Sequence, residues 1–484
     1  MNFSDVMREE SKWTKTENGA DVKNTTDSAL LDMFATIGSM RSRSEDEIIQ
    51  KFELAFQEDP LGAMRCLFYA RDIRGGLGER RVFRVLLPYV AEKHKKELDK
   101  NLRLVAEFGR FDDFYSFVGT NLEDRMWECV KSQLSLDIIA MQENEPCSLL
   151  AKWLKKADAS SPNTRKLGIY TAKKLGMSVY EYKRICNRLR KHIDIVEQRM
   201  SARQWDTINY PAVPSRAMLN YRKAFARHDQ ERFAEYINKV SSGEQKINAA
   251  TLYPYDIVEK ILYQHEDSKV LEAQWDNLPN YVDGDVNAVV MADVSGSMSG
   301  RPMATSIGLA MYFAERNKGA YHNLFMTFSG TPEFVEIKGN TITQKINFIS
   351  RANWDMDTDL EAALLKILDV AMENHCTQEE MPKSLIIISD MEINRCTEQE
   401  HGENFYDYVS RVYEEHGYKI PNVVFWNVNS RNDVFLADKN RKGVQLVSGQ
   451  SASTFKNLIG CVDKTPVEMM YSVLNSERYQ AIQI

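Results

Sequence analysis

The sequence contains no long hydrophobic run. No apolar stretch in its 484 residues approaches the ~18–20 residues that a membrane-spanning helix needs. The first residues, MNFSDVMREE, contain no basic segment leading into an apolar one, so we expect no signal peptide. These absences predict a soluble, cytoplasmic protein with no membrane partner.

Cysteine is sparse, and no two cysteines form a CxxC pair. An odd number of scattered cysteines favours reduced thiols over a disulfide framework. One group, His375, Cys376, Cys396 and His401, is worth testing for zinc, but its spacing matches no common zinc finger. Buried or incidental cysteines are the better interpretation. The seven cysteines are Cys66, Cys129, Cys147, Cys186, Cys376, Cys396 and Cys461.

The chain as a whole also lacks an excess of positive charge, with a formal net charge of −7. That value hides an uneven distribution. Residues 151–250 carry 21 Lys and Arg against 9 Asp and Glu, whereas residues 301–484 carry 18 against 24. The basic block is compatible with a polyanionic partner despite the acidic total.

The N-terminal half has helical periodicity almost throughout. Apolar residues recur at i, i+4 and i+7 in 48–57, 79–98 and 182–200, and in the last of these Ile185, Leu189, Ile193 and Val196 share a face. No clean repeat is visible. We therefore expect an α-solenoid with degenerate HEAT-like repeats, or alternatively a single irregular helical domain.

After about residue 280 the sequence pattern changes to apolar strands that alternate with amphipathic helices. This alternation predicts a mostly parallel α/β sheet with helices on both faces, and such sheets bind ligands at the carboxyl ends of their strands. The expected strands lie in 286–295, 323–329, 332–338, 383–392, 422–429 and 444–449. The expected domains are an irregular leader (1–28), a helical domain (29–280), the α/β domain (281–464) and a helical tail packing back on the helical domain (465–484).

Oxygen ligands stand at the ends of these strands. Asp293, Ser295 and Ser297 form a DxSxS turn after the first strand, Thr358 precedes a helix, and Asp390 ends the strand LIIISD. One carboxylate and two hydroxyls would supply half of the six oxygens that a Mg²⁺-sized cation requires. A DxSxS sequence alone also occurs by chance, so the two later oxygens decide the interpretation.

In these five residues the sequence resembles the von Willebrand factor A (vWA) domain and its metal-ion-dependent adhesion site (MIDAS). The resemblance implies a Rossmann-like fold, a bound Mg²⁺ (or Mn²⁺), and an open coordination position for a partner's carboxylate. Met391 follows the later Asp where many vWA domains have glycine. The nearby Asp355, Asp357 and Asp359 support the cation indirectly or, alternatively, form a solvated loop and a helix N-cap.

No enzymatic motif accompanies this site. No histidine lies nearby in sequence to act as a general base, and Met298 stands where a nucleophile elbow needs serine. The Gly75–Gly78 run lies between helical stretches and predicts a tight turn.

A helical half followed by a vWA domain is also the order in the Ro (TROVE–vWA) ribonucleoproteins. The segments at 68–84, 148–154, 213–237, 247–258 and 465–482 resemble a family of TROVE-like/vWA proteins that are distant relatives of Ro. In Ro proteins helical repeats form a ring closed by the vWA domain, and RNA contacts the ring. The resemblance therefore implies a TROVE-like helical domain that binds RNA.

Cations interleaved with aromatic residues give this idea independent support, because they suit a sequence-tolerant grip on single-stranded RNA. The alternative interpretation is a solvated basic helix face whose aromatic residues pack inward. The candidate RNA-binding residues are Arg71, Arg74, Arg80, Arg81, Lys152, Lys155, Lys156, Lys173, Lys174, Arg184, Arg188 and Lys191.

Three functions follow from the sequence. The leading hypothesis is a Ro-like protein that binds single-stranded or non-coding RNA, with the vWA site docking a partner or closing the ring. The alternative is a metal-dependent protein-interaction adaptor without RNA binding. A metal-dependent hydrolase is weaker because a general base is missing.

Overall fold

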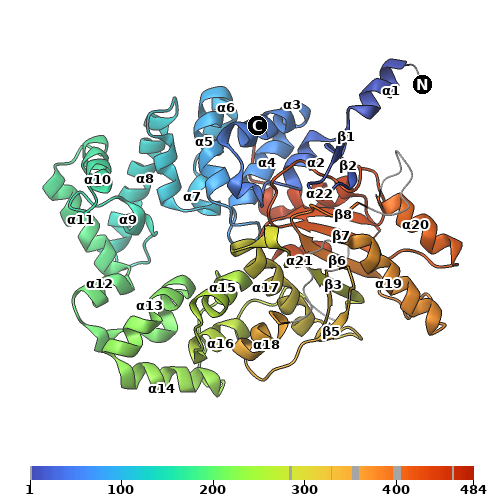
Figure 1. The fold of residues 1–484 in the computed structure, drawn as a ribbon. Coiled ribbons are helices and arrows are strands. Elements are labelled where there is room, and N and C mark those ends of the chain that lie inside the picture. The colour runs from blue at the N-terminus through green and yellow to red at the C-terminus, as the bar shows by residue number, and fades with distance from the viewer. Residues whose placement is uncertain (1–2, 283–285, 329, 352–358, 396–404, 460–462) are drawn as a thin grey trace.

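The structure, a computed structural model, shows two parts of different secondary structure (Figure 1). A helical arc occupies residues 29–276, and a sheet domain occupies residues 286–459. This is the predicted fold class, an all-α part followed by an α/β part with a mostly parallel sheet. The structure describes residues 3–282, 286–328, 330–351, 359–395, 405–459 and 463–484.

Within the described residues the main sheet has six strands in the order β5-β4-β3-β6-β7-β8, and only β4 and β5 pair antiparallel. Every residue of β3 and β8 is buried, so both faces of the sheet are covered. The strands are β3 (Ala288–Ala292), β4 (Leu324–Thr327), β5 (Phe334–Glu336), β6 (Ser384–Ser389), β7 (Asn422–Asn427) and β8 (Val444–Ser448). The helices are α17 (Arg301–Arg316), α18 (Ile342–Ile349), α19 (Leu360–Glu373), α20 (Phe405–Glu415) and α21 (Thr454–Leu458). Each predicted strand segment contains one of these strands.

Several helices of the arc begin at local capping signals. Ser44 and Glu47 form a capping box at α3, and Ser178 and Glu181 form one at α11. In chain order the arc contains α2 (Ala29–Phe34), α3 (Glu45–Glu58), α4 (Pro60–Arg71), α5 (Arg81–Lys93), α6 (Lys95–Lys100), α7 (Leu104–Phe108), α8 (Glu123–Gln142), α9 (Leu150–Trp153), α10 (Pro162–Lys174), α11 (Val179–His192), α12 (Val196–Ser201), α13 (Ser215–His228), α14 (Gln230–Ser241), α15 (Pro254–Gln264) and α16 (Lys269–Asp276).

The buried face of α11 differs from the predicted one. Tyr182, Cys186 and Leu189 are buried, whereas Ile185 and Ile193 are half-buried. The expected helix over 182–200 is in fact two helices, α11 and α12, so periodicity carried across their junction shifts the inferred face.

Both ends of the arc pack on the sheet domain or its tail. At one end α2 and α4 contact α22 (Pro466–Leu474), and at the other end α15 packs along α17. Between these contacts the chain runs outward through α8–α11 and returns through α13 and α14 (Figure 1). One hydrophobic core extends from the first helices of the arc through the sheet to the tail, and a second core lies within residues 196–273.

The polar leader is ordered, contrary to the expectation of an irregular segment. Residues Phe3–Glu10 form α1, and β1 (Trp13–Lys15) pairs antiparallel with β2 (Asp21–Lys23). Lys23 also exchanges two backbone hydrogen bonds with Phe435, of 3.1 and 2.8 Å. We call residues 13–23 the N-terminal hairpin. Its backbone partner lies about 400 residues away in sequence, which local periodicity does not reveal.

The predicted turn at Gly75–Gly78 joins α4 to α5 and brings the two ends of the arc together. Gly78 has a φ of +65°, and a Cβ atom at this position would overlap the Tyr253 hydroxyl at the start of α15. We expect Gly78→Ala to destabilise the protein by about 2–5 kcal/mol, because a left-handed conformation costs roughly 1–2 kcal/mol and overpacking about 1–3 kcal/mol.

Urea unfolding would measure this loss. Gly176→Ala is the matched control, since Gly176 has a φ of +73° with open space around it and should show the conformational cost alone. Adding Tyr253→Phe should recover part of the Gly78→Ala loss. Equal losses for the two glycine variants would show that the Tyr253 contact contributes nothing.

Candidate functional site

The two predicted acidic ligands lie side by side at one edge of the sheet. Asp293 directly follows β3 and Asp390 directly follows β6, and these strands are parallel neighbours. The chain continues from β3 to β4 on one side, whereas β6 lies on the other, so the two carboxylates stand where the strand order reverses. This is the position at which open α/β sheets bind ligands.

Asp293 is buried, with 1% of its surface exposed. Its Oδ1 accepts a hydrogen bond of 2.8 Å from the Ser295 backbone N–H, and its Oδ2 accepts one of 2.6 Å from the Ser389 hydroxyl. Burial and the negative charge of Asp390 nevertheless raise the pKa of Asp293 to about 6. The Asp390 carboxylate therefore disfavours the charged form of Asp293.

The two serines of the DxSxS turn lie close together. The Ser295 and Ser297 hydroxyl oxygens are 3.0 Å apart. Adjacent ligands of an octahedral cation with bonds of about 2.1 Å are separated by about 3.0 Å, so this spacing fits two neighbouring positions around Mg²⁺.

The remaining predicted ligand, Thr358, lies outside the described residues, as do Asp355 and Asp357. Asp359 is described, and its side chain caps α19 by accepting a hydrogen bond of 2.8 Å from the Ala362 N–H. This hydrogen bond is a helix N-cap, which was the alternative interpretation of Asp359.

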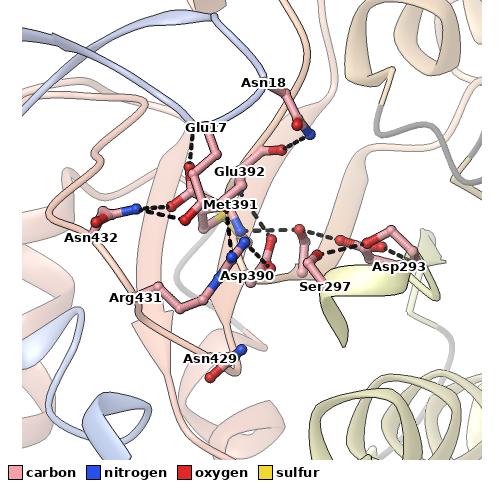
Figure 2. A network of polar contacts seen from close by, with 12 residues as sticks. Glu17, Asn18, Asp293, Ser297, Asp390, Met391, Glu392, Asn429, Arg431 and Asn432 are labelled. Carbon is pink, nitrogen blue, oxygen red and sulfur yellow. Dashed lines mark hydrogen bonds and ion pairs between the residues drawn. The ribbon is translucent and has the colours of Figure 1, made fainter. Parts of the chain in front are cut away.

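An arginine that the sequence did not single out contacts the same site. Arg431 Nη2 lies 2.9 Å from Asp390 Oδ2, and its Nη1 lies 2.6 Å from Glu17 Oε2 in the N-terminal hairpin. Figure 2 shows this chain of contacts, with Asp293 and Ser297 on one side of Asp390 and Glu17 on the other. Arg431 follows β7, so its position after the end of a strand could have identified it from the sequence as a candidate site residue. No feature of the sequence around Glu17 could have identified that residue.

The residues at this edge fit a small, hard cation. They are oxygen donors, two of them are buried acidic groups, and the serine spacing suits octahedral geometry. No group of three or more His, Cys, Asp or Glu side chains with metal-binding geometry occurs in the parts of the chain that the structure describes. Any cation here would therefore depend on the serine oxygens. The zinc candidate is incompletely placed, because Cys396 and His401 lie outside the described residues.

Several predicted RNA-binding cations have acidic partners within the protein. Arg71 is buried and lies 2.9 Å from Asp113, which makes it a structural residue. Lys174 lies 3.1 Å from Asp124, and Lys152 lies 3.6 Å from Glu197. Acidic residues of the arc therefore neutralise the charges of these three cations, at least in part. Arg71 is therefore corrected from a candidate RNA contact to an internal ion pair.

Other cations of the predicted set are exposed. Arg74, Arg80, Lys156 and Lys173 are exposed, whereas Lys155 is half-buried over the Tyr115 ring. Arg80, Arg81 and Arg84 line a surface cavity of about 700 Å³ between α3 and α5. Partial burial and the neighbouring Arg110 and Arg84 lower the pKa of Arg80.

The clearest basic feature is a stripe along α11, which we call the α11 stripe. Arg184, Arg188 and Lys191 are all exposed, and none of them has an ion-pair partner among the described residues. Tyr180, one turn before Arg184, has 73% of its surface exposed. Spacings of three and four residues place these four side chains along one side of the helix.

Comparisons with known proteins give relatives without an assigned activity. The chain is 27% identical over 501 residues to "Uncharacterized protein L728" of Acanthamoeba polyphaga mimivirus, covering 95% of this chain and 86% of that protein. Among solved structures it is similar to the Deinococcus radiodurans RO (RSR) protein, with a TM-score of 0.40 and 11% identity, over 93% of this chain and 100% of that one. In the described residues, no helix has the length and apolar character to span a bilayer.

Two family profiles match the chain. Residues 287–478 match the family described as "Domain of unknown function (DUF7788)". Residues 16–145 and 144–284, more than half of the chain, match the family described as "Domain of unknown function (DUF2828)". This protein therefore belongs to the DUF2828 family.

Proposed function

We propose that the helical arc binds single-stranded RNA and that the α11 stripe is the main contact surface. The observation that carries this proposal is the exposed combination of Tyr180 with Arg184, Arg188 and Lys191. Three exposed cations on one helix face attract phosphates, and an exposed aromatic ring offers a surface on which a base can stack. The resemblance of the sequence to Ro ribonucleoproteins supports the same class of ligand.

Base stacking and surface charge both favour single-stranded RNA over duplex RNA as the ligand. An unstacked base can reach Tyr180, whereas bases in an A-form duplex lie in a deep, narrow groove or inside the stack. The net charge of −7 repels nucleic acid from much of the surface, so binding should be local to the stripe. RNA with a free single-stranded 3′ end is expected to compete better than a blunt duplex.

Replacing Arg184, Arg188 and Lys191 together with alanine should weaken binding to every RNA sequence. Each phosphate contact on a single strand contributes about −0.7 to the slope of log K against log salt, so the slope should become shallower by up to about 2. Fluorescence anisotropy with a labelled RNA at several salt concentrations would measure it. The fold should be retained, because all three side chains are exposed.

A charge-matched control tests whether the effect is local. Lys93, Lys95 and Lys96 are exposed on α5 and α6, and their replacement removes the same charge far from the stripe. Tyr180→Ala should weaken affinity while leaving the salt slope unchanged, because stacking releases no counterions. If both triple variants weaken binding equally, the α11 stripe is not the main contact surface. If wild-type protein shows no affinity at physiological salt, the protein is an adaptor without RNA binding.

We also propose that the sheet domain is a vWA domain whose MIDAS binds one Mg²⁺ or Mn²⁺ and docks a protein partner. Asp293 and Asp390, with Ser295 and Ser297, would hold the cation, which would supply an open coordination position for a partner's carboxylate. The support is the facing pair of buried carboxylates and the 3.0 Å spacing of the serine oxygens. The proposal gives the protein no catalytic activity, since no general base is assigned to the site.

A further inference from the structure

The N-terminal hairpin lies on the loops that follow β6 and β7, beside the candidate cation site. The Thr16 hydroxyl donates to the Ile393 carbonyl at 2.7 Å, and the Glu17 backbone N–H donates to Glu392 Oε2 at 2.7 Å. The Asn18 side-chain amide donates to the Glu392 carbonyl, also at 2.7 Å. The turn of the hairpin is therefore fixed to the loop that carries Asp390.

Arg431 is the link between this hairpin and the acidic pair. Asp390 is fully buried, Arg431 is 29% exposed, and Glu17 is 47% exposed, so the chain of charges runs from the interior to the surface (Figure 2). The Arg431 Nε is buried and has no hydrogen-bond partner in the described part of the chain. The guanidinium therefore gives up part of its hydrogen bonding to hold both carboxylates.

We infer that Arg431 is the internal counter-ion of the cation site and that cation binding releases it, together with its hold on the N-terminal hairpin. This inference rests on the cation site proposed above. A guanidinium keeps its charge at any physiological pH, so it cannot yield to a metal ion by losing a proton. A divalent cation bound at Asp390 repels it, and Arg431 must move toward solvent.

The movement has a consequence for Glu17. When Arg431 leaves, the carboxylate of Glu17 loses its closest cationic partner and keeps the weaker 3.2 Å contact with the Asn432 amide. The hairpin keeps its backbone hydrogen bonds to Phe435 and the three contacts of its turn with Glu392 and Ile393, so we expect the turn to loosen without detaching.

The arrangement also indicates the kind of partner that this edge accepts. Glu17 places an acidic side chain on the outer side of Arg431, and a partner's acidic residue would need the same approach to the edge. Glu17 therefore acts as an internal stand-in for an acidic segment of a protein partner. Coupling between two binding events is reciprocal. If cation binding weakens the hairpin contact by a certain factor, removal of that contact must tighten cation binding by the same factor.

Mn²⁺ titration by calorimetry tests this coupling in the full-length protein. We expect Arg431→Gln to lower the Kd for Mn²⁺ at least tenfold and Glu17→Gln to lower it by about threefold, since Glu17 only positions the arginine. Arg199→Gln is the matched control, because it breaks an arginine–aspartate pair (with Asp194) in the helical arc and should change nothing. Circular dichroism checks that each variant is folded, and the exposed Glu17 keeps the test available if Arg431→Gln is unstable.

Deuterium exchange provides a second readout that does not depend on affinity. In wild-type protein, Mn²⁺ should increase exchange in residues 16–19, and in Arg431→Gln the exchange should already be high without Mn²⁺. Equal Mn²⁺ affinities in wild type and both variants, or unchanged exchange in the hairpin, would overturn the inference while leaving the cation site intact. Absence of Mn²⁺ binding in wild type and in Arg431→Gln would instead overturn the cation site itself.

Discussion

Replacing Asp293 with asparagine is expected to lower the affinity for Mg²⁺ or Mn²⁺ by at least about 100-fold while the protein stays folded. Residues that merely support metal ligands already contribute about 10–100-fold, so losing a charged ligand should cost at least the upper value. The fold should tolerate the change because asparagine has nearly the same shape. Its side-chain oxygen can still accept the hydrogen bond from the Ser295 backbone N–H, and its NH2 group can donate to the Ser389 hydroxyl oxygen, which then accepts instead of donating.

This substitution also removes the two factors that raise the pKa of Asp293, the burial of a charged carboxylate and its repulsion by Asp390. In the presence of a chelator, the melting temperature of the variant should therefore equal or exceed that of wild type. Calorimetric titration measures the affinity, and Asp206→Asn, an exposed carboxylate on the arc, is the control. Ser295→Ala and Ser297→Ala should each weaken binding less, since neutral oxygens contribute less Coulomb energy. Unchanged affinity in Asp293→Asn would refute the site.

Deleting residues 465–484 is expected to prevent the protein from folding into a soluble form. This tail places Met469, Met470, Leu474 and Tyr479 in the core that the arc and the sheet share. Removing the segment exposes apolar surface of both parts at once, and each fully buried large side chain is worth about 1.5–3 kcal/mol.

A single substitution in the tail tests the same packing in a protein that still folds. Tyr479 is fully buried, and its ring stacks on Phe108 and meets Tyr69 edge-on. Tyr479→Ala should cost about 3–5 kcal/mol, the range for truncating large buried aromatic residues. Soluble yield and urea unfolding would measure both changes, with deletion of residues 1–10 as the control for an exposed terminal helix. A tail deletion that melts like wild type would show that the tail does not join the two parts.

Two arginine residues show that composition alone does not predict which basic residues are exposed. Arg71 and Arg184 are indistinguishable as basic residues near aromatic ones, yet Arg71 is buried against Asp113 whereas Arg184 is exposed. The difference depends on which surface faces the neighbouring helix. Periodicity identified α11 as a helix but misplaced its buried face, because the register of packing is set by α8, α9 and α10 around it.

Local pattern was enough to predict the strands of the main sheet and the edge of the sheet that holds the candidate site. Strands such as β3 and β6 are continuous apolar runs, and a polar residue at the end of each must leave the sheet at its carboxyl edge. Asp293 and Asp390 were predictable for that reason, because the rule needs nothing beyond local pattern and the parallel arrangement.

The residues that surround this edge depend on contacts between segments that are distant in sequence. Glu17 and Arg431 are separated by 414 positions in sequence, and the ordered hairpin that carries Glu17 looked irregular when read alone. Local periodicity reports which residues a helix or strand buries, but an ion pair between distant segments depends on where the whole chain brings them. The candidate ligands could therefore be read from the sequence, whereas the contacts that join Asp390 through Arg431 to the hairpin could not.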